Sequence, residues 1–374
     1  MFSSIRNPGG SPVPADTSAY AYDRVADVRA LHRMLPGYAA TPLRSLPGTA
    51  AELGIRGLYV KDESSRFGLK AFKGLGGSYA MFRILCRELG LDPTAATLQD
   101  IRANPRTAKQ TFVTTTDGNH GKGVSWAAGV FGCPSYVFMP RGTVPARAEA
   151  VRQAGTAEVT VTDLCYDDCV RMTARLAAEN GWHLIQDTSW PGYTEVPEWI
   201  MLGYTTMVYE ALSQMPVPPT HVLVQAGVGS LAGTVCAVLH EAFGDALPRI
   251  SIVEADAAAC IYETMAADDG QLHTSSGSGI TMMAGLNCGT PCSLAWNLIH
   301  SYAFSCMEIG DDDCAMGMRS LAHPLADDPA IVAGESGASG FAAALQAAFR
   351  PDDVVLVFNT EGDTDPENYR AICS

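Results

Sequence analysis

Short apolar segments alternate along the chain with longer stretches in which apolar positions recur every three or four residues. The short segments are typical of buried β-strands and the longer ones of amphipathic helices. The strand-like segments are 57–61, 111–114, 136–139, 158–162, 183–186, 221–225, 249–253 and 353–358. The helix-like segments are 71–88, 121–130, 145–154, 167–180, 197–215, 231–243 and 341–349. Strands that alternate with helices predict βαβ units, an α/β fold class and mostly parallel sheets.

Two stretches follow neither pattern. Residues 1–14 are polar and contain several Gly and Pro residues, and they lack the basic and apolar regions of a secretory signal. We expect them to form a loose leader arm. Residues 266–293 are rich in Gly, Ser, Thr and Met, which predicts an irregular loop that could close over a substrate.

Polar and glycine-rich residues follow many of the predicted strands. They are residues 115–120, 187–193, 225–233, Glu254 and 359–365. Ligands of open parallel sheets bind beyond the carboxyl ends of the strands. We therefore expect a functional site at the junction of two such α/β blocks.

The charge of the chain narrows the range of its partners. Its 374 residues carry a formal net charge of −15, whereas nucleic acids and anionic membranes are bound by basic surfaces. No apolar run approaches the roughly 20 residues of a membrane-spanning helix. We expect neither nucleic acid nor a membrane as a partner.

The 11 cysteines are odd in number and scattered, which suits a reducing cytoplasm better than a disulfide framework. Two pairs share one spacing, Cys165 with Cys169 and Cys288 with Cys292. A zinc site would need further paired ligands, so buried or incidental thiols are the simpler interpretation. A reversible disulfide involving Cys260, Cys288 or Cys292 stays open, and we assign no metal ligands.

A lysine near a predicted helix start is the first candidate for covalent chemistry. Lys73 follows Ala71 and Phe72, whose apolar side chains could partly desolvate its amine. A Schiff base requires such a neutral amine near a carbonyl. Taken alone, a lysine here is more simply a solvated charge, and only companion motifs favour a chemical role.

A glycine-rich turn is the second candidate. Gly227, Gly229 and Gly233 follow the predicted strand 221–225. They permit positive φ angles and the close approach of an anion to backbone N–H groups at a helix start. A phosphate site, a nucleotide site and a plain tight turn all remain alternatives.

Two polar loops complete the candidates. Asp117 could be an acid/base or a helix N-cap, and Asp187 an acid/base or a turn residue. Asn119 could bond a cofactor oxygen or stabilise its turn, and His120 is more simply structural. An amine, polar loops and an anion cradle are together what a protein needs to hold pyridoxal phosphate (PLP).

These motifs, in this order and spacing, resemble the fold-type II PLP enzymes, which include threonine dehydratase, serine racemase, cysteine synthase and tryptophan synthase β. The resemblance covers about residues 40–365, and within the group the chain most resembles the diaminopropionate ammonia-lyase family. The stretches that carry it are 71–73, 114–121, 186–193, 197–204, 283–286 and 360–365.

The resemblance implies two open, twisted, mostly parallel sheets with flanking helices. Residues 1–75 would form the N-terminal part of a large domain, 76–190 a small α/β domain, and 191–374 the rest of the large PLP-binding domain. The resemblance also implies a homodimer.

The resemblance assigns cofactor-binding roles. Lys73 would form the Schiff base with PLP, and Asn119 would contact the ring oxygen. Gly227, Val228, Gly229, Ser230 and Leu231 would hold the phosphate. Asn359 or Thr360 would bond the pyridine nitrogen, where many relatives have serine. Such a neutral partner would leave that nitrogen unprotonated.

The resemblance also suggests substrate-binding and catalytic roles. Most fold-type II enzymes have a small polar residue where this chain has Asp117, which could move a proton on the ring face opposite Lys73. Asp187 could bind the second ammonium group of a diamino substrate or act as an acid/base. The expected substrate-binding residues are Thr116, Asp117, His120 and Asp187, and the expected catalytic ones are Lys73, Asp117 and Asp187.

The implied activity is PLP-dependent α,β-elimination of 2,3-diaminopropionate, D and/or L, to pyruvate and two ammonia. A serine/threonine ammonia-lyase or a β-replacement enzyme on a related amino acid would use the same cofactor. A non-catalytic protein that binds a nucleotide through the glycine loop is a third hypothesis, against which Lys73 argues.

Overall fold

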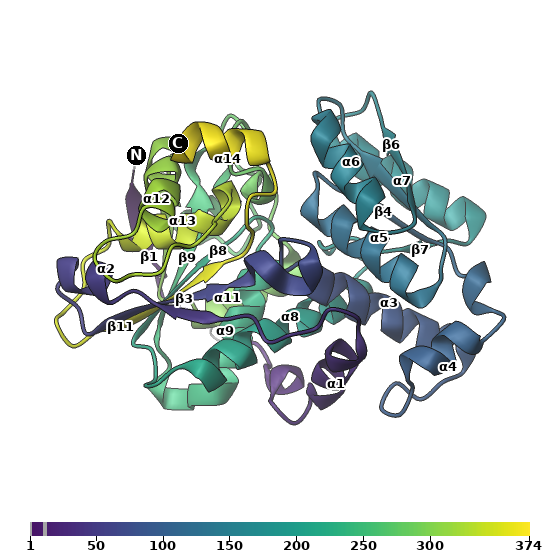
Figure 1. Cartoon of the computed structure of the whole chain (residues 1–374), viewed down its shortest axis with the longest axis horizontal. Coiled ribbons are helices and arrows are strands. Elements are labelled where there is room, and N and C mark those ends of the chain that lie inside the picture. The colour runs from purple at the N-terminus through teal and green to yellow at the C-terminus, as the bar shows by residue number, and fades with distance from the viewer. Residues whose placement is uncertain (1, 10–12) are drawn as a thin grey trace. The chain divides into compact units, whose positions relative to one another are not determined.

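The computed structural model describes residues 2–9 and 13–374, and the chain divides into two compact units (Figure 1). Unit 1 comprises Met1–Arg24, Ala40–Ser65 and Met207–Ser374. Unit 2 comprises Val25–Ala39 and Arg66–Thr206.

The described residues of unit 1 form a seven-stranded sheet in the order β1-β10-β9-β8-β11-β3-β2. Its strands are β1 (Ser3–Arg6), β2 (Leu43–Ser45), β3 (Gly57–Asp62), β8 (His221–Gln225), β9 (Arg249–Ala255), β10 (Ser305–Ile309) and β11 (Val354–Asn359). The five inner strands are parallel, and the edge strands β1 and β2 are antiparallel to their neighbours. All six residues of β11 are buried, as expected of a parallel strand that is covered on both faces.

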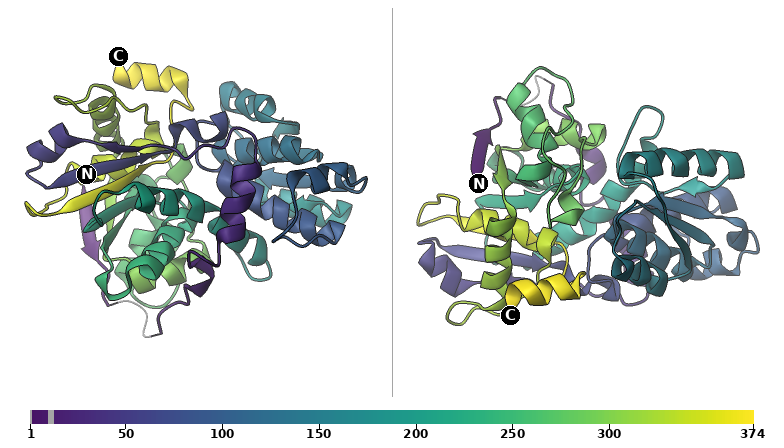
Figure 2. Two further views of the ribbon diagram at one scale, coloured as in Figure 1. Left: turned by 60° about the horizontal axis from the view of Figure 1, so that its bottom comes forward. Right: turned by 90° about the horizontal axis from the view of Figure 1, so that it is seen from above.

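Helices cover both faces of this sheet. They are α2 (Pro47–Glu52), α9 (Ser230–Phe243), α10 (Cys260–Ala267), α11 (Ser293–Tyr302), α12 (Asp311–Ala322), α13 (Glu335–Ala344) and α14 (Pro366–Cys373). In Figure 1, α12, α13 and α14 lie above the strands and α9 lies below them. Phe341 of α13 packs into the core with Val355 and Val357 of β11. Figure 2 shows α14, in yellow, at the surface of this unit in both views.

Unit 2 has a four-stranded parallel sheet in the order β6-β5-β4-β7. Its strands are β4 (Phe112–Thr115), β5 (Ser135–Met139), β6 (Ala157–Val161) and β7 (His183–Leu184). Its helices are α1 (Ala26–Met34), α3 (Gly74–Leu89), α4 (Leu98–Ala103), α5 (Asn119–Phe131), α6 (Pro145–Ala154), α7 (Tyr166–Asn180) and the first part of α8 (Glu195–Gln214). Val137 and Met139 of β5 pack against Ala148 and Val151 of α6.

Two glycines allow close helix packing around the start of α3. A Cβ atom on Gly123 of α5 would lie 3.0 Å from the carbonyl group of Lys73, and one on Gly76 of α3 would lie 2.7 Å from the Ile200 side chain of α8. The distance at Gly76 is too short for a real Cβ, and a Cβ at Gly123 would fit only if its neighbours at the start of α3 shifted slightly. Lys73 is held where it is because these helices approach so closely.

The hydrophobic pattern predicts the architecture well and some boundaries less well. The α/β class with two mostly parallel sheets is confirmed. Helix α3 begins at Gly74, so Lys73 is its N-cap residue rather than a member of its first turn. The pattern did not predict α1, α11, α12 or β10.

The expectation of a loose leader arm is wrong for residues 3–6. Ser3–Arg6 form β1, which pairs antiparallel with β10 from Ser3 opposite Glu308 to Arg6 opposite Ser305. Backbone pairing with an existing sheet needs little apolar content, so the polar composition did not signal it. Residues 1 and 10–12 of the expected arm lie outside the described residues.

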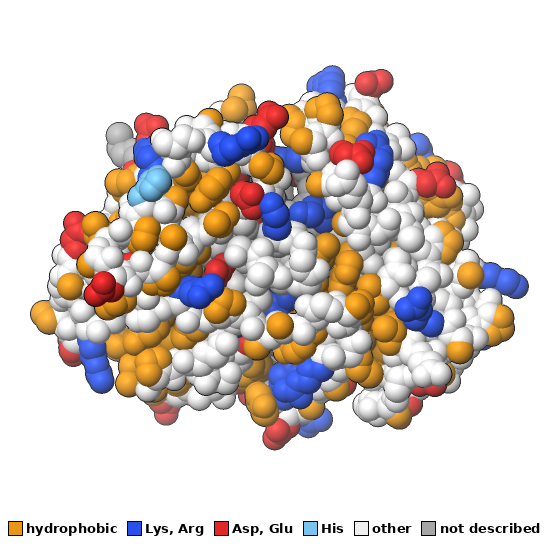
Figure 3. All heavy atoms as spheres, in the orientation of Figure 1, with side chains coloured by type: hydrophobic (Ala, Val, Ile, Leu, Met, Phe, Trp, Pro, Cys, Tyr) orange, Lys and Arg blue, Asp and Glu red, His pale blue; other side chains and the backbone are white. Residues whose placement is uncertain are grey.

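The surface carries both signs of charge. On the face in Figure 3, Lys and Arg side chains lie in small groups among Asp and Glu side chains, without one continuous basic area. Within the described part of the chain, no helix has the length and apolar character needed to cross a membrane.

Candidate active site

Lys73 lies at the start of α3 in a partly buried, aromatic environment in unit 2. Its side chain is 21% exposed, and its Nζ atom lies 5.4 Å from the centroid of the Phe72 ring and 6.0 Å from that of Tyr204. The two rings pack together at 4.7 Å between centroids. The Lys73 Nζ atom donates a hydrogen bond to Oδ2 of Asp187 and forms an ion pair with it. The amine is therefore partly desolvated and held by one carboxylate.

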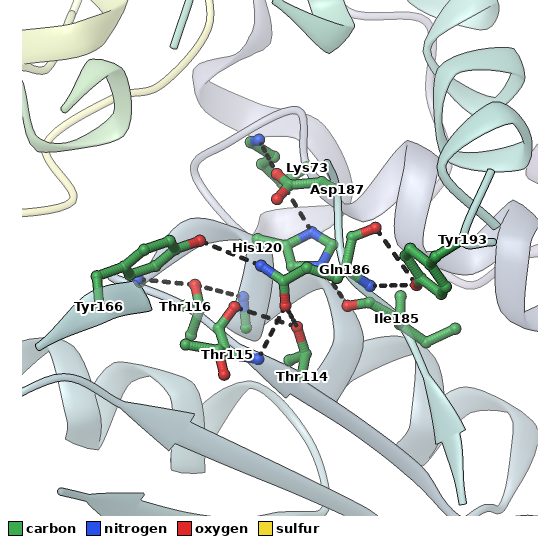
Figure 4. Close-up of polar contacts among 12 residues, drawn as sticks. Lys73, Thr114, Thr115, Thr116, His120, Tyr166, Ile185, Gln186, Asp187 and Tyr193 are labelled. Carbon is green, nitrogen blue, oxygen red and sulfur yellow. Dashed lines mark hydrogen bonds and ion pairs between the residues drawn. The ribbon is translucent and has the colours of Figure 1, made fainter. Parts of the chain in front are cut away.

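Asp187 follows β7 and joins Lys73 to His120 (Figure 4). Burial alone would raise the pKa of Asp187, but the Lys73 ammonium holds it well below its usual range. Asp187 is therefore a carboxylate at neutral pH. It could bind any ammonium group that takes the place of the Lys73 amine.

His120 is buried at the start of α5. Its Nε2 atom lies 2.8 Å from the carbonyl oxygen of Ile185, and its Nδ1 atom lies 3.8 Å from Oδ2 of Asp187. Burial lowers the pKa of His120, Asp187 opposes this effect, and Lys73 adds to it. Because a carbonyl only accepts, Nε2 carries the proton, and Nδ1 of the neutral ring faces Asp187 as a proton acceptor.

Gln186 and Tyr193 hold Asp187 in place. The Gln186 side chain accepts a hydrogen bond from the backbone N–H of Thr115 at 3.2 Å, which ties the residue before Asp187 to the end of β4. The Tyr193 hydroxyl accepts from the Gln186 backbone N–H at 2.8 Å and donates to the carbonyl of Leu184 at 2.9 Å. Both residues lie in the stretch 186–193, but the sequence pattern alone gave them no role.

Asp117 is the second carboxylate of the candidate site in unit 2, and its environment differs from that of Asp187. Burial raises the pKa of Asp117 to about 6, the Arg147 charge opposes this rise, and Asp187 adds to it. Arg147 belongs to α6, and its Cδ atom lies 3.8 Å from the place of a Cβ on Gly118. A pKa near neutrality suits a group that exchanges protons. Arg147 was missed from the sequence because nothing there links α6 to Asp117.

Thr116 shapes the loop that carries Asp117. Its buried hydroxyl accepts hydrogen bonds from the backbone N–H groups of Gly118 at 2.9 Å and Gly121 at 3.0 Å. A Cβ on Gly121 would lie 2.3 Å from Cγ2 of Thr116, so only glycine fits there. Asn119 is the first residue of α5 and is partly buried. Thr116 thus stabilises the conformation of the turn that contains Asp117 and Asn119.

The predicted phosphate loop lies in unit 1 between β8 and α9. Gly229 has φ +96°, a left-handed conformation that favours glycine, and it is the N-cap of α9. A Cβ on Gly227 would lie 2.8 Å from Sγ of Cys288, and one on Gly229 would lie 3.0 Å from the Ile261 and Ile299 side chains. The backbone N–H of Cys292 donates to the carbonyl of Val228 at 2.7 Å. A residue outside the loop thus helps to hold the loop's conformation.

This loop fits a phosphate group. Ser230 and Leu231 are the first residues of α9, and N–H groups in the first turn of a helix have no partner within that helix. Together with Val228 and Gly229 they form a turn without side chains at its two glycines, at the positive end of a 14-residue helix. The sequence prediction of an anion cradle is therefore compatible with the geometry.

Asn359 and Thr360 lie at the carboxyl end of β11, the strand next to β8 in the sheet. The Asn359 side chain donates to Asp62 Oδ1 at 2.9 Å and to the carbonyl of Val332 at 3.0 Å. The Thr360 hydroxyl contacts Nε2 of Gln225 at 2.9 Å. Asn359 is thus engaged in structural bonds, whereas Thr360 lies beside the last residue of β8.

The structure gives no sign of a metal centre or a disulfide among the residues that it describes. No three His, Cys, Asp or Glu side chains in residues 2–9 and 13–374 are grouped to hold an ion. All 11 cysteines have free thiols, and ten of them are buried or partly buried.

Comparison with known proteins agrees with this geometry. The family model described as "Pyridoxal-phosphate dependent enzyme" matches residues 34–361. The chain is 42% identical over 360 residues to diaminopropionate ammonia-lyase of Escherichia coli strain K12, covering 92% of this chain and 89% of that protein.

Two solved structures of the diaminopropionate ammonia lyase from Escherichia coli are also similar. The holo form matches with a TM-score of 0.93 and the complex with D-serine with a TM-score of 0.92. Each is 39% identical and covers 100% of this chain and 96% of the other.

Proposed function

The chain belongs to the pyridoxal-phosphate dependent enzymes and, within them, to the diaminopropionate ammonia-lyases, and we propose that it converts 2,3-diaminopropionate to pyruvate and two ammonia. The observation that carries the proposal is the pair of carboxylates in unit 2. Asp187 binds the Lys73 amine and stays ionised, whereas the pKa of Asp117 is raised to about 6. Two titratable groups with opposed pKa shifts are the usual basis of separate acid and base roles.

The chain's own residues divide the task of holding PLP. Lys73 supplies the amine that binds the aldehyde, and Asn119 the contact to the ring oxygen. Residues 227–231 hold the phosphate at the start of α9. When bound, the cofactor supplies an electron-withdrawing ring that makes the substrate Cα–H bond acidic.

Lys73 and Asp117 are the residues that we propose to move the Cα proton. The Lys73 amine is partly buried beside two aromatic rings, and it becomes available as a base once its bond to Asp187 is exchanged. Asp117 can accept a proton when the pH exceeds about 6. Having two bases on two different segments of unit 2 would allow D and L enantiomers to be deprotonated by different residues.

Asp187 is the residue that we propose to recognise the second amino group of the substrate. It already binds one ammonium group, that of Lys73, in a buried setting. The β-ammonium group of diaminopropionate is the same chemical group and can replace it. Serine and threonine carry a hydroxyl instead, which would leave this buried carboxylate without a cationic partner.

The proposed reaction is an elimination followed by a hydrolysis. The Cα–H and Cβ–N bonds break, and the β-nitrogen leaves as ammonia after it gains a proton. The remaining enamine is 2-aminoacrylate, whose hydrolysis consumes one water and yields pyruvate and the second ammonia. His120 Nδ1 lies beside Asp187 and is placed to receive or return a proton there.

An assay of both products tests the proposal. PLP-loaded protein is mixed separately with D- and L-diaminopropionate, serine and threonine, and keto acid and ammonia are measured. We expect pyruvate and ammonia in a ratio of one to two from diaminopropionate, and much less keto acid from serine or threonine. Faster turnover of serine or threonine would support the alternative ammonia-lyase. Cofactor spectral changes without keto acid would instead indicate β-replacement.

We further propose that the enzyme works in the cytoplasm as a homodimer. Its 11 free thiols support a reducing compartment. Light scattering at several protein concentrations tests the homodimer. The division into a large domain (1–75 and 191–374) and a small one (76–190) stays a prediction.

A further inference from the structure

Tyr204 is a tyrosine of α8 that the proposed reaction does not yet use. Its side chain is fully buried, and its hydroxyl has no hydrogen-bond partner among the residues that the structure describes. A buried hydroxyl without a partner costs free energy, and such groups are rare in native proteins. This hydroxyl therefore calls for a partner that the contacts in the structure do not supply.

The ring of Tyr204 is held against α3. A Cβ on Gly76 of α3 would lie 2.6 Å from Cε1 of Tyr204, and one on Gly203 of α8 would lie 2.6 Å from the carbonyl oxygen of Leu75. The two glycines thus let the helices approach closely, and the Tyr204 ring packs with its centroid 4.7 Å from that of Phe72. A ring enclosed in this way keeps its hydroxyl in one place.

The Lys73 amine lies beside this ring. Its Nζ atom is 6.0 Å from the centroid of the Tyr204 ring. Burial raises the pKa of the Tyr204 phenol well above its usual value, and Lys73 is the main influence that opposes this rise. The phenol thus keeps its proton at neutral pH and interacts with the charge of the lysine.

Lys73 has to change its partner before it can act as a base. In the structure its Nζ atom donates to Asp187, and the negative charge of this carboxylate stabilises the ammonium form, which has no free lone pair. A neutral phenol can accept a hydrogen bond from an amine N–H without adding a negative charge. Tyr204 can therefore hold Lys73 as a neutral amine whose lone pair stays free.

We propose that Tyr204 is a positioning residue that takes over the Lys73 amine from Asp187 and holds it while it removes the Cα proton. The inference rests on the proposed function, which gives Asp187 to the β-ammonium group of the substrate and makes Lys73 a base. The Tyr204 oxygen accepts a hydrogen bond from one N–H of the amine. The Lys73 lone pair forms a new N–H bond as the Cα–H bond breaks, and the electron pair of the Cα–H bond passes to the cofactor ring. Tyr204 keeps its own proton throughout.

The stability of Tyr204→Phe tests the first step of this argument. The substitution removes the hydroxyl and keeps the ring. Because the hydroxyl has no partner in the structure, the whole chain without cofactor should unfold at the same or a higher denaturant concentration than the wild type. A variant that unfolds at a lower concentration would show that the hydroxyl is already paired, and would overturn the proposal.

Tyr79→Phe is the matched control for this measurement. Tyr79 is also buried and lies on α3, but its hydroxyl donates to Asp27 at 2.9 Å and accepts from Arg83 at 2.8 Å. The same substitution here removes two hydrogen bonds, so Tyr79→Phe should unfold at a lower denaturant concentration than the wild type.

The kinetics of the PLP-loaded protein test the positioning itself. The substrates are D- and L-diaminopropionate with hydrogen or deuterium at Cα. With the enantiomer whose proton Lys73 removes, Tyr204→Phe should lower kcat about tenfold, as expected of one lost hydrogen bond, and change KM less than about twofold. The deuterium isotope effect on kcat should be at least as large as in the wild type, because proton removal then limits the rate. An undiminished kcat with both enantiomers, or a loss accompanied by a smaller isotope effect, would overturn the proposal.

The outcomes also distinguish this inference from the proposed function. Wild-type protein that takes up no PLP, or makes no pyruvate from diaminopropionate, would contradict the proposed function itself. An active wild type together with a Tyr204→Phe variant of unchanged kinetics would contradict only the role of Tyr204.

Discussion

Lys73 combines an amine, two aromatic neighbours and a carboxylate partner at one helix start. Replacing it with alanine removes the group that binds the cofactor aldehyde, so Lys73→Ala should lose essentially all turnover and the cofactor absorbance of a Schiff base. Absorbance spectra and the pyruvate assay check this. Lys109→Ala, which removes an exposed lysine of unit 2, is the control and should behave like the wild type. Normal turnover in Lys73→Ala would contradict the assignment.

Asp117 and Asp187 show how surroundings separate two identical side chains. Asp187 is stabilised as an anion by Lys73, whereas the main influence on Asp117 is burial. The positive charge of Arg147 lowers the pKa of Asp117. A substitution of Arg147 can therefore change the pKa of Asp117 while the carboxylate itself is kept.

Arg147→Met should raise the pKa of Asp117 above its value of about 6. A base must be ionised, so the rate of any step that Asp117 serves falls as the pH drops through its pKa. The acidic limb of the pH–rate profile should therefore move to higher pH in this variant, and profiles with D- and L-diaminopropionate measure the shift. Arg152→Met is the control, because Arg152 lies on the same helix and pairs with the exposed Glu149. Identical shifts in both variants would rule out a local effect on Asp117.

At the scale of single elements, the loop between β8 and α9 is the part of the site that depends most on backbone conformation. Gly229→Ala places a Cβ at φ +96° and 3.0 Å from two isoleucine side chains. We expect a loss of about 1–2 kcal/mol in the free energy of unfolding, from the left-handed conformation, and much weaker PLP binding. Chemical denaturation and PLP titration measure the two effects.

Gly132→Ala is the matched control for Gly229→Ala. Gly132 has φ +85°, but a Cβ there would meet no other atom within 4 Å. It should lose a similar amount of stability and keep its affinity for PLP. Equal losses of PLP affinity in both variants would show that the loop conformation does not serve the phosphate.

The same elements show what a sequence can and cannot predict. The strand-loop-helix order around Gly227 and Gly229 is local, so its pattern is visible in the sequence. The contact between Lys73 and Asp187 joins residues 114 positions apart, and only the family resemblance brought them into one hypothesis. Arg147 lies on α6 and influences Asp117 from there, and no local pattern in the sequence links the two. β1 was missed because it has only four residues, of mostly polar character.

For the whole molecule, Glu254 links folding to pH. It is fully buried at the end of β9 and accepts hydrogen bonds from the backbone N–H groups of Ile261 at 2.9 Å and Tyr262 at 2.6 Å. Burial raises the pKa of Glu254 from 4.5 to about 8. The folded state thus binds this proton more tightly than the unfolded chain does.

The stability that this proton provides is complete below pH 4.5 and is lost as the pH rises to about 8. Glu254→Gln cannot titrate, so the free energy of unfolding should fall less between these limits in the variant than in the wild type. Denaturation at a series of pH values gives the two slopes. The variant's absolute stability will also change, since glutamine cannot accept both hydrogen bonds, and therefore only the slopes are compared. Equal slopes would mean that Glu254 is already ionised in the folded protein.

The pairing of β1 with β10 has a consequence for how molecules of this protein meet one another. β1, in purple in Figure 2, covers the outer side of β10. A chain that begins at Pro8 would leave the backbone N–H and C=O groups along that side of β10 open, and an open strand edge is a template for pairing with another chain. We expect such a chain to self-associate increasingly as its concentration rises, and dynamic light scattering in comparison with the chain that contains β1 would detect it. We therefore expect β1 to protect the edge of β10 from pairing with other chains. An affinity tag is better attached after Ser374 than before β1.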